Sequence, residues 1–566
     1  MVKSAFIIIL FILYEYKKKI YLLKSRLFYL INGFFGKIKE IIVNKKISFH
    51  SYLEVNRIKW EKIDNSNNSS EYKILISNFV GHPGYTLPEC FLGKYLSKFS
   101  AFDAIGLLSN RDLSGKKILK SFNINKFYLY EETNLLKKLK LLIKVINIMK
   151  SVDSIDKFVN LQIDQIDLGK ISYDHYIRYT GIPSENKIKL KFYFFLVEAF
   201  FIHEYCKKIF KDKKISILVA SEIQFIPAAV IFQNALKNNV NVYARDGGPS
   251  AFGVRKFTNS SEKNESWCKY PKSLIDFASK KYSKYAIKKG GELIERRFSN
   301  QPLDIDSLDA KLAHNKNLKS LTKKELCNLF NWDVSKPIAC IFGNDLIDGN
   351  FVDGKRLFLE NITWLKYTLK EIKEIKSVNW IVKEHHSRPY AGQHPKITLA
   401  DVYYKICDGN DHIKLLPNHI GGSSLKNLIS LAVVGGGTCG LEYPCLDIPA
   451  LVAGEPYYAG LGFTIEPQTQ DEYFSYLRNI KKIPKLTPEQ INTAKIFVYV
   501  QFILSKFKHP LMPVYNHTEF GKKSKDKFWN HSKHLIQNYN VEEDKFMRMF
   551  ENQYINNNKY LINLDI

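Results

Sequence analysis

The hydrophobic pattern of the first half of the chain alternates short apolar runs with longer segments of helical periodicity. The apolar runs have the length of strands that are buried on both faces of a parallel sheet. We expect strands over 72–77, 104–108, 126–130, 215–220 and 240–244, and helices over 88–98, 135–149, 188–210 and 226–237. Because strand and helix alternate, residues 65–262 are predicted to form a doubly wound α/β domain.

The same alternation returns in the second half of the chain. The pattern indicates strands over 337–342, 379–382, 413–416, 431–434 and 450–453, and helices over 361–375, 469–480 and 488–504. A second doubly wound domain is therefore predicted over 332–482, after a charged connector over 263–331 and before C-terminal helices and a tail over 483–566. The expected fold class is α/β, with two Rossmann-like domains facing a cleft.

The N-terminal segment, residues 1–64, mixes cations with large apolar side chains. The apolar run 5–14 is far shorter than the roughly 20 residues that span a bilayer. Residues 17–30 carry lysines and apolar side chains at helical spacing, which is typical of a helix lying in an anionic membrane interface. An amphipathic helix packed on the protein's own surface is the alternative.

The charge and cysteine content narrow the possible partners. The formal net charge of +28 predicts an anionic partner, although a lysine-rich composition alone also explains it. No dense basic block with interleaved aromatics stands out beyond the N-terminus, so nucleic acid is not expected. The 8 cysteines include no C-x-x-C pair, which indicates reduced thiols in a cytosolic protein. No metal site is expected; Asp304 and Asp306 lie in the connector rather than after a strand.

One stretch, residues 428–466, carries the strongest signal. The apolar run 431–434 ends at three glycines, and Thr438 could then cap a short helix. Gly435, Gly437 and Gly440 match the G-x-G-x-x-G pattern of dinucleotide sites, but Pro444 ends the helix too early for that fold. A glycine turn before a helix N-terminus still favours phosphate. Cys439 is not expected to be a nucleophile, because no histidine pairs with it.

Ionisable side chains gather where other predicted strands end. Residues 383–389 place Lys383, His385, His386 and Arg388 after the strand 379–382, and two cations at one strand end favour an anionic ligand. Five residues near strand ends or in the polar, aromatic segment 167–178 qualify as a general base: Glu222, His82, Glu89, Asp174 and Asp246. For His82 the alternative is shaping a turn, and for Glu222 it is capping the next helix.

Four motifs, in their order and spacing, resemble the capsule polysaccharide biosynthesis proteins, which include Kdo-type transferases. They are FGNDLIDG (342–349) with Trp364-Leu365, VKEHH (382–386), GGTCGLEYP (436–444) and AGEPYYAGLGFT (453–464). The resemblance covers about residues 335 to 480 well. The family's usual Lys-x-His-Pro is Lys383-Glu384-His385-His386 here, without the following proline, so either histidine could face the ligand.

The resemblance implies a metal-independent GT-B glycosyltransferase without a cofactor. Such an enzyme moves a sugar from a nucleotide-sugar donor to a capsule- or lipopolysaccharide-type polysaccharide, or to its lipid-linked precursor, at the inner face of the cytoplasmic membrane. Glu442 matches the family's glutamate after the glycine turn, where it would contact a ribose or act as a structural cap. The donor site would comprise Lys383, His385, His386, Arg388, Gly436, Gly437, Thr438, Cys439, Gly440, Glu442 and Tyr457.

Two alternatives to a transferase stay open at this point. One is a non-catalytic component of polysaccharide export that kept a GT-B scaffold. The other is a nucleotide-sugar epimerase, which shares the two-domain architecture but needs no membrane attachment.

Overall fold

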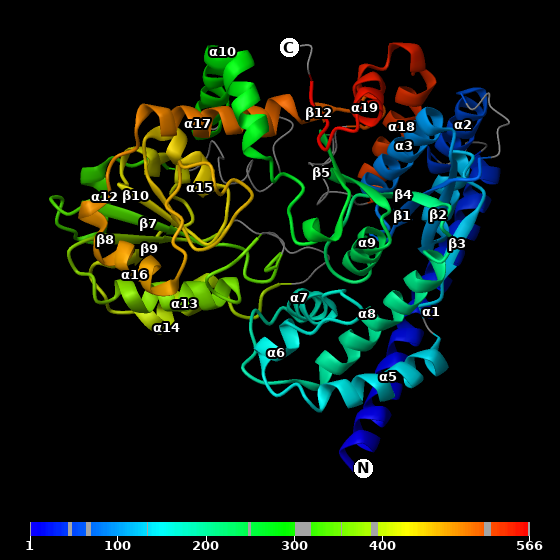
Figure 1. Ribbon diagram of the computed structural model, residues 1–566, viewed down its shortest axis with the longest axis horizontal. Helices are drawn as coiled ribbons and strands as arrows, with labels where there is room; N and C mark the ends of the chain where they lie inside the picture. The colour runs from blue at the N-terminus through cyan, green and yellow to red at the C-terminus, as the bar shows by residue number, and fades with distance from the viewer. Residues whose placement is uncertain are drawn as a thin grey trace. The chain divides into compact units, whose positions relative to one another are not determined.

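The computed structural model describes residues 2–43, 48–63, 70–132, 134–246, 251–299, 301, 319–351, 354–385, 394–513 and 522–563 (Figure 1). The chain divides into two compact units. Unit 1 comprises residues 1–175, 186–263 and 507–566, and unit 2 comprises 176–185 and 264–506. The segment expected to be a connector therefore lies mostly in unit 2, and the C-terminal region is shared between the units.

Unit 1 is built on a seven-stranded sheet whose parallel part has the order β3-β2-β1-β4-β5. These strands are β1 (Lys73–Asn78), β2 (Asp103–Ser109), β3 (Phe127–Tyr130), β4 (Ile215–Ala220) and β5 (Asn241–Asp246). The order is that of a Rossmann fold, in which the chain direction across the sheet reverses between the first and fourth strands. Two strands absent from the sequence prediction extend the sheet, β6 (Ala251–Phe257) and β12 (Phe507–Lys508). Strand β6 pairs antiparallel with β5, and β12 pairs antiparallel with β6.

The helices of unit 1 cover this sheet and match most of the predicted amphipathic segments. They are α1 (Val2–Val43), α2 (Ser48–Ile63), α3 (Pro83–Ser100), α4 (Leu113–Ser121), α5 (Leu135–Met149), α6 (Ile155–Val159), α7 (Leu168–Thr180), α8 (Leu190–Ile209), α9 (Ala228–Lys237), α18 (Lys522–Gln537) and α19 (Lys545–Ile555). Helix α7 occupies the polar segment for which the sequence showed no clear periodicity, and its last residues belong to unit 2.

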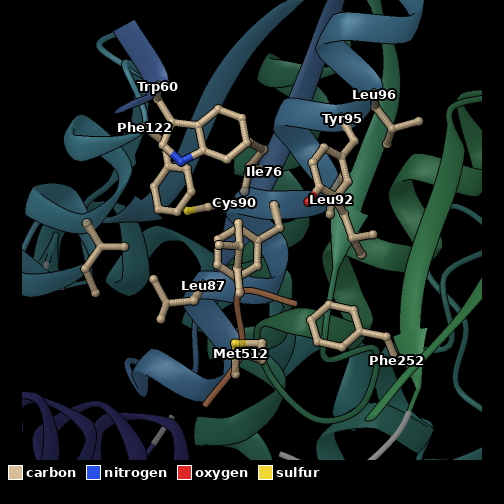
Figure 2. Close-up of a cluster of buried hydrophobic side chains, with 14 of the residues drawn as sticks. Trp60, Ile76, Leu87, Cys90, Leu92, Tyr95, Leu96, Phe122, Phe252 and Met512 are labelled. Atoms are coloured by element: carbon tan, nitrogen blue, oxygen red, sulfur yellow. The ribbon is translucent and has the colours of Figure 1, made fainter. Parts of the chain in front are cut away.

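The hydrophobic core of unit 1 combines residues that are far apart in sequence. Figure 2 shows Trp60 and Phe122 on one side of helix α3, and Phe252 and Met512 on another. All four are buried and belong to one apolar cluster. The segment after residue 507 is therefore part of the unit 1 core, because its apolar side chains cover α3.

Unit 2 repeats the same topology with a five-stranded parallel sheet of order β9-β8-β7-β10-β11. Its strands are β7 (Ile338–Phe342), β8 (Asn379–Lys383), β9 (Ile413–Leu415), β10 (Leu431–Val434) and β11 (Ala450–Val452). Each lies within one residue of its predicted bounds at either end, as is typical of fully buried apolar runs. The predicted α/β class with two Rossmann-like units is thus confirmed by two sheets of the same order.

The helices of unit 2 include two from the segment that was expected to connect the domains. They are α10 (Lys272–Phe298), α12 (Lys323–Phe330), α13 (Asn361–Ile372), α14 (Leu399–Cys407), α15 (Cys439–Glu442), α16 (Gln470–Arg478) and α17 (Pro488–Tyr499). Helix α10 packs along α17, so residues on both sides of the sheet-forming segment belong to one folded body.

Candidate functional site

The site in unit 2 lies where its sheet changes direction, between β7 and β10. In doubly wound sheets, ligands bind beyond the carboxyl ends of the strands at this switch point. The loop after β7 begins with Gly343 and Asn344, and the loop after β10 is the glycine turn 435–437. The loops after β10 and β11 lie side by side, since Ala432 pairs with Ala450. Strand β8, which carries Lys383, is separated from β10 by β7.

Asn344 lies directly against the glycine turn. A Cβ atom at Gly435 would be 2.7 Å from Asn344 Nδ2, and one at Gly437 would be 3.3 Å from its Oδ1. Asn344 Nδ2 donates to Asn361 Oδ1 at 3.2 Å, which fixes the amide in this position. Gly435 is therefore required by close approach, whereas Gly436 faces open space. The sequence analysis did not select Asn344, although it lies in one of the quoted motifs.

The short helix α15 follows the turn, and it is as short as Pro444 predicted. The Thr438 side chain makes no capping hydrogen bond, so the expected cap is wrong. The Gly440 amide donates to Gly437 O at 3.1 Å and is therefore used inside the turn. Within the described chain the amides of Thr438 and Cys439 have no backbone acceptor. Burial raises the pKa of the Cys439 thiol to about 12, which keeps it protonated at neutral pH.

Tyr458, rather than Tyr457, contacts the glycine turn. Its hydroxyl donates to Gly437 O at 2.7 Å, and a Cβ atom at Gly440 would be 2.1 Å from the same hydroxyl. Tyr457, which was expected in the donor site, stacks on Phe497 of α17 with ring centroids 6.1 Å apart. Successive residues of this loop thus point to different neighbours, and the sequence gives no signal of which one faces the turn.

Lys383 ends β8, and its side chain lies against Gly422 in the segment before β10. A Cβ atom at Gly422 would be 3.0 Å from Lys383 Cε. The Lys383 charge lowers the pKa of the Cys439 thiol, opposing the larger effect of burial, so the ammonium lies within electrostatic reach of the turn. His385 is exposed two residues further on. His386 and Arg388 lie outside the described residues, as do Asp304 and Asp306.

The Glu442 side chain forms a buried ion pair with Arg297. Arg297 Nη1 of α10 donates to Glu442 Oε1 at 2.7 Å, and the side chains are only 3% and 7% exposed. The Arg297 guanidinium also lies over the Phe502 ring, 4.3 Å from its centroid. Of the two roles left open for Glu442, this contact supports the structural one. Arg297 could not be selected from sequence, because it lies 145 residues away in the expected connector.

The corresponding switch point of unit 1 lies between β1 and β4 and centres on Glu89 of α3. Glu89 Oε1 accepts a hydrogen bond of 3.0 Å from the Ser221 amide, just after β4. The residue is 2% exposed, and Oε2 has no partner within the described residues. Burial raises the Glu89 pKa well above its usual value, against the opposing effects of the Ser221 amide and the Arg245 charge. Burial therefore favours the protonated form of this carboxyl.

His82 and Glu222, two of the five candidate bases, each accept a hydrogen bond from a backbone amide close by in the chain. His82 is the N-cap of α3, where Nδ1 accepts from the Gly84 amide at 3.0 Å. Burial, aided by the Lys525 charge, lowers the His82 pKa to about 4, so the ring is neutral at pH 7. Glu222 Oε1 accepts from the Gln224 amide at 2.7 Å. The His82 contact agrees with the turn-shaping role weighed in the sequence, whereas Glu222 does not cap the next helix, α9, whose N-cap is Pro227.

Further polar groups line the same edge of the unit 1 sheet. Arg245 Nε donates to Ser221 Oγ at 3.3 Å and lies over the Tyr85 ring. Asn78, at the end of β1, donates to Asp112 Oδ2 at 2.8 Å. Asp246 ends β5 beside Arg245, whereas Asp174 is buried on α7. Asn78, Asp112 and Arg245 could not be selected from sequence, because their part in the site depends on contacts with residues at the ends of other strands.

The described residues contain no group of three or more His, Cys, Asp or Glu side chains placed to hold a metal ion. None of the helices they form is long and apolar enough to cross a membrane. All 8 cysteines are free thiols.

No protein-family model and no curated protein matches the chain. Among solved structures, a KpsC β-Kdo 2,4 transferase from Thermosulfurimonas dismutans shares 12% identity over 57% of this chain and 88% of its own, with a TM-score of 0.29. A UDP co-structure of S. aureus MnaA shares 11% identity over 76% and 92%, with a TM-score of 0.24. A Rickettsia africae glycosyltransferase shares 10% identity over 76% and 94%, with a TM-score of 0.22. Likenesses of this size assign neither a family nor an activity.

Proposed function

We propose that the protein is a glycosyltransferase of the GT-B type that takes its sugar from a nucleotide-sugar donor. The observation that carries this proposal is the glycine turn 435–437 at the switch point of unit 2. Asn344 and Tyr458 hold the turn, Gly436 faces open space, and Lys383 brings a positive charge to the same region. A turn that admits close backbone approach beside a cation suits a diphosphate or monophosphate leaving group.

Unit 2 binds the donor in this proposal. Lys383 and His385 neutralise the phosphate as it leaves, and the amides of Thr438 and Cys439 donate to its oxygens. His386 and Arg388 add positive charge to the same loop. Because these groups supply the charge stabilisation, the reaction requires no metal ion, and no cofactor takes part.

Unit 1 holds the acceptor and supplies the base. The bond between the anomeric carbon and the phosphate oxygen breaks, and the acceptor hydroxyl oxygen bonds to that carbon. The hydroxyl proton passes to a carboxylate of unit 1. Burial favours the protonated form of Glu89, which argues against its acting as the base, and His82, with its pKa lowered to about 4, is a weak base. Among Glu222, Asp174 and Asp246, only Glu222 lies at the switch point, directly after β4, and we assign the base to it.

The acceptor proposed is a capsule- or lipopolysaccharide-type polysaccharide or its lipid-linked precursor. Support comes from the motif resemblance of residues 335–480 and from the exposed apolar and basic residues of α1, which suit the cytoplasmic face of an anionic membrane. Nucleic acid is not a partner in this proposal.

The test is nucleotide release by the purified full chain from a panel of CMP- and UDP-sugars, with and without a lipid-linked acceptor. The expected result is release from one donor class, lost on Lys383→Ala with His385→Ala and retained on Lys405→Ala, an exposed lysine of α14. If no donor binds or turns over, a non-catalytic role replaces the transferase. If the donor sugar is instead epimerised without an acceptor product, the protein is an epimerase.

A further inference from the structure

Over residues 4–27, whose side chains the structure describes, helix α1 has two opposite faces, and only one of them is covered by the protein. On the covered face, Phe11 is fully buried and its ring lies 5.2 Å from that of Phe194 on α8. One turn further along, Glu15 Oε2 lies 3.1 Å from Lys138 Nζ of α5. Lys18 Nζ then lies 2.8 Å from Glu198 Oε1 of α8. These contacts are all within unit 1, and they fix which side of α1 points outward.

The outward face of α1 is a continuous apolar stripe. The residues recur every three or four positions, the spacing that places side chains on one side of a helix. Each is between 37% and 63% exposed: Phe6, Ile9, Leu13, Tyr16, Ile20, Leu23 and Leu27. At a rise of 1.5 Å per residue the stripe is about 30 Å long. Exposed apolar surface of this extent marks an interaction site rather than an ordinary solvent face.

The residues beside the stripe indicate whether it binds a second copy of this chain or a membrane surface. Apolar spacing of three and four would also suit a coiled coil with a second copy of this chain. However, the charged residues flanking the stripe are all exposed cations: Lys17, Lys19, Lys24 and Arg26. Two identical helices would set these like charges against one another. The only carboxylate between residues 4 and 27 is Glu15, which is buried and paired with Lys138.

We infer that α1 lies in the plane of an anionic membrane, with the apolar stripe in the bilayer interface and the flanking cations at the lipid headgroups. This inference deepens the membrane part of the proposed function. Long cationic side chains beside an apolar face reach the headgroups while their stems stay in the apolar layer. Helix α5, which packs against α1, has the same combination of exposed residues: Leu136, Lys137, Lys140, Ile143 and Lys144 (Figure 1).

Vesicle flotation with the full chain tests the inference. Vesicles of phosphatidylcholine with about 30% phosphatidylglycerol should bind the protein, and neutral vesicles should bind it far less, because each cation near an anionic surface strengthens binding about fivefold. Replacing Lys17, Lys19, Lys24 and Arg26 by Gln should abolish the preference for anionic vesicles. Leu13→Gln with Ile20→Gln should lower binding to both vesicle types. The matched control replaces four exposed lysines of unit 2 by Gln: Lys280, Lys284, Lys481 and Lys482.

The mass of the protein in lipid-free solution, measured by light scattering, separates the two occupants. A monomer that binds anionic vesicles supports the inference. A dimer that becomes monomeric on Leu13→Gln with Ile20→Gln, without vesicle binding, overturns it in favour of a second copy. Equal binding of the control and the four-cation variant also overturns it. Donor turnover in solution is scored separately, so failure of the transferase proposal leaves the vesicle result standing.

Discussion

Arg297 Nη1 and Glu442 Oε1 form a 2.7 Å ion pair that joins α10 to α15, with both side chains almost fully buried. The helix that follows the glycine turn is thus held by an arginine that lies far away in sequence. Removing one member of a buried ion pair leaves the other charge without compensation.

Glu442→Ala is therefore expected to destabilise unit 2 by about 3 kcal/mol. Chemical denaturation followed by fluorescence would measure this loss. Glu442→Ala with Arg297→Met should be much less destabilising than the sum of the two single changes, because no buried charge is left unpaired. A variant of unchanged stability that no longer binds nucleotide would instead support a ribose contact for Glu442.

The glycines of the turn are predicted to differ in their tolerance of a methyl group. Gly440→Ala should destabilise the protein by about 1 to 3 kcal/mol, because the new Cβ would overlap the Tyr458 hydroxyl. Gly436→Ala is the matched control, since a Cβ atom there meets nothing within 4 Å. Urea unfolding of both variants checks the difference. Similar midpoints for the two would show that Tyr458 does not hold the turn as described.

Glu89→Gln is predicted to make the stability of unit 1 less dependent on pH, because burial favours the neutral carboxyl, which Gln mimics. The raised folded-state pKa of Glu89 means that the folded protein holds a proton which the unfolded chain releases above about pH 4.5. Its contribution to stability is therefore fully present below that pH and is lost as pH rises toward the folded pKa. Glu89→Gln should flatten this dependence in denaturation curves between pH 5 and 8, and a steeper curve would contradict the assignment.

Lys138→Met is predicted to release α1 from unit 1. Lys138 Nζ contacts both Glu15 and Glu198, so its removal leaves two buried carboxylates with less compensation. Burial, and then the Glu198 charge, raise the Glu15 pKa to about 7. Amide hydrogen exchange in α1 should be faster in this variant than in the native protein. The ratio of the two rates should be larger at pH 8 than at pH 6. Lys137→Met, at an exposed neighbour, is the control and should leave exchange unchanged.

The strands were predictable because parallel strands buried on both faces are continuous apolar runs, as in β4 and β10. Helix α7 was not, because its polar and aromatic residues follow no clear period. The place of Lys383 at the end of β8 followed from chain order, but its neighbours did not, and Glu89 lies within α3 rather than in the loop before it. The pairing of Glu442 with Arg297, and the choice of Tyr458 over Tyr457 at the turn, depend on contacts between distant segments, which a single sequence does not encode locally.

The return of the chain to unit 1 after residue 507 constrains the order in which the protein can fold during synthesis. Phe252 and the α3 side chains are made early, but Met512, strand β12 and the core residues of α18 and α19 leave the ribosome only after unit 2 is complete. All strands of unit 2 are therefore synthesised before unit 1 is complete. Until β12 is made, the nascent unit 1 keeps part of its apolar surface exposed. During that interval the exposed apolar surface makes unit 1 the part of the chain most prone to aggregation.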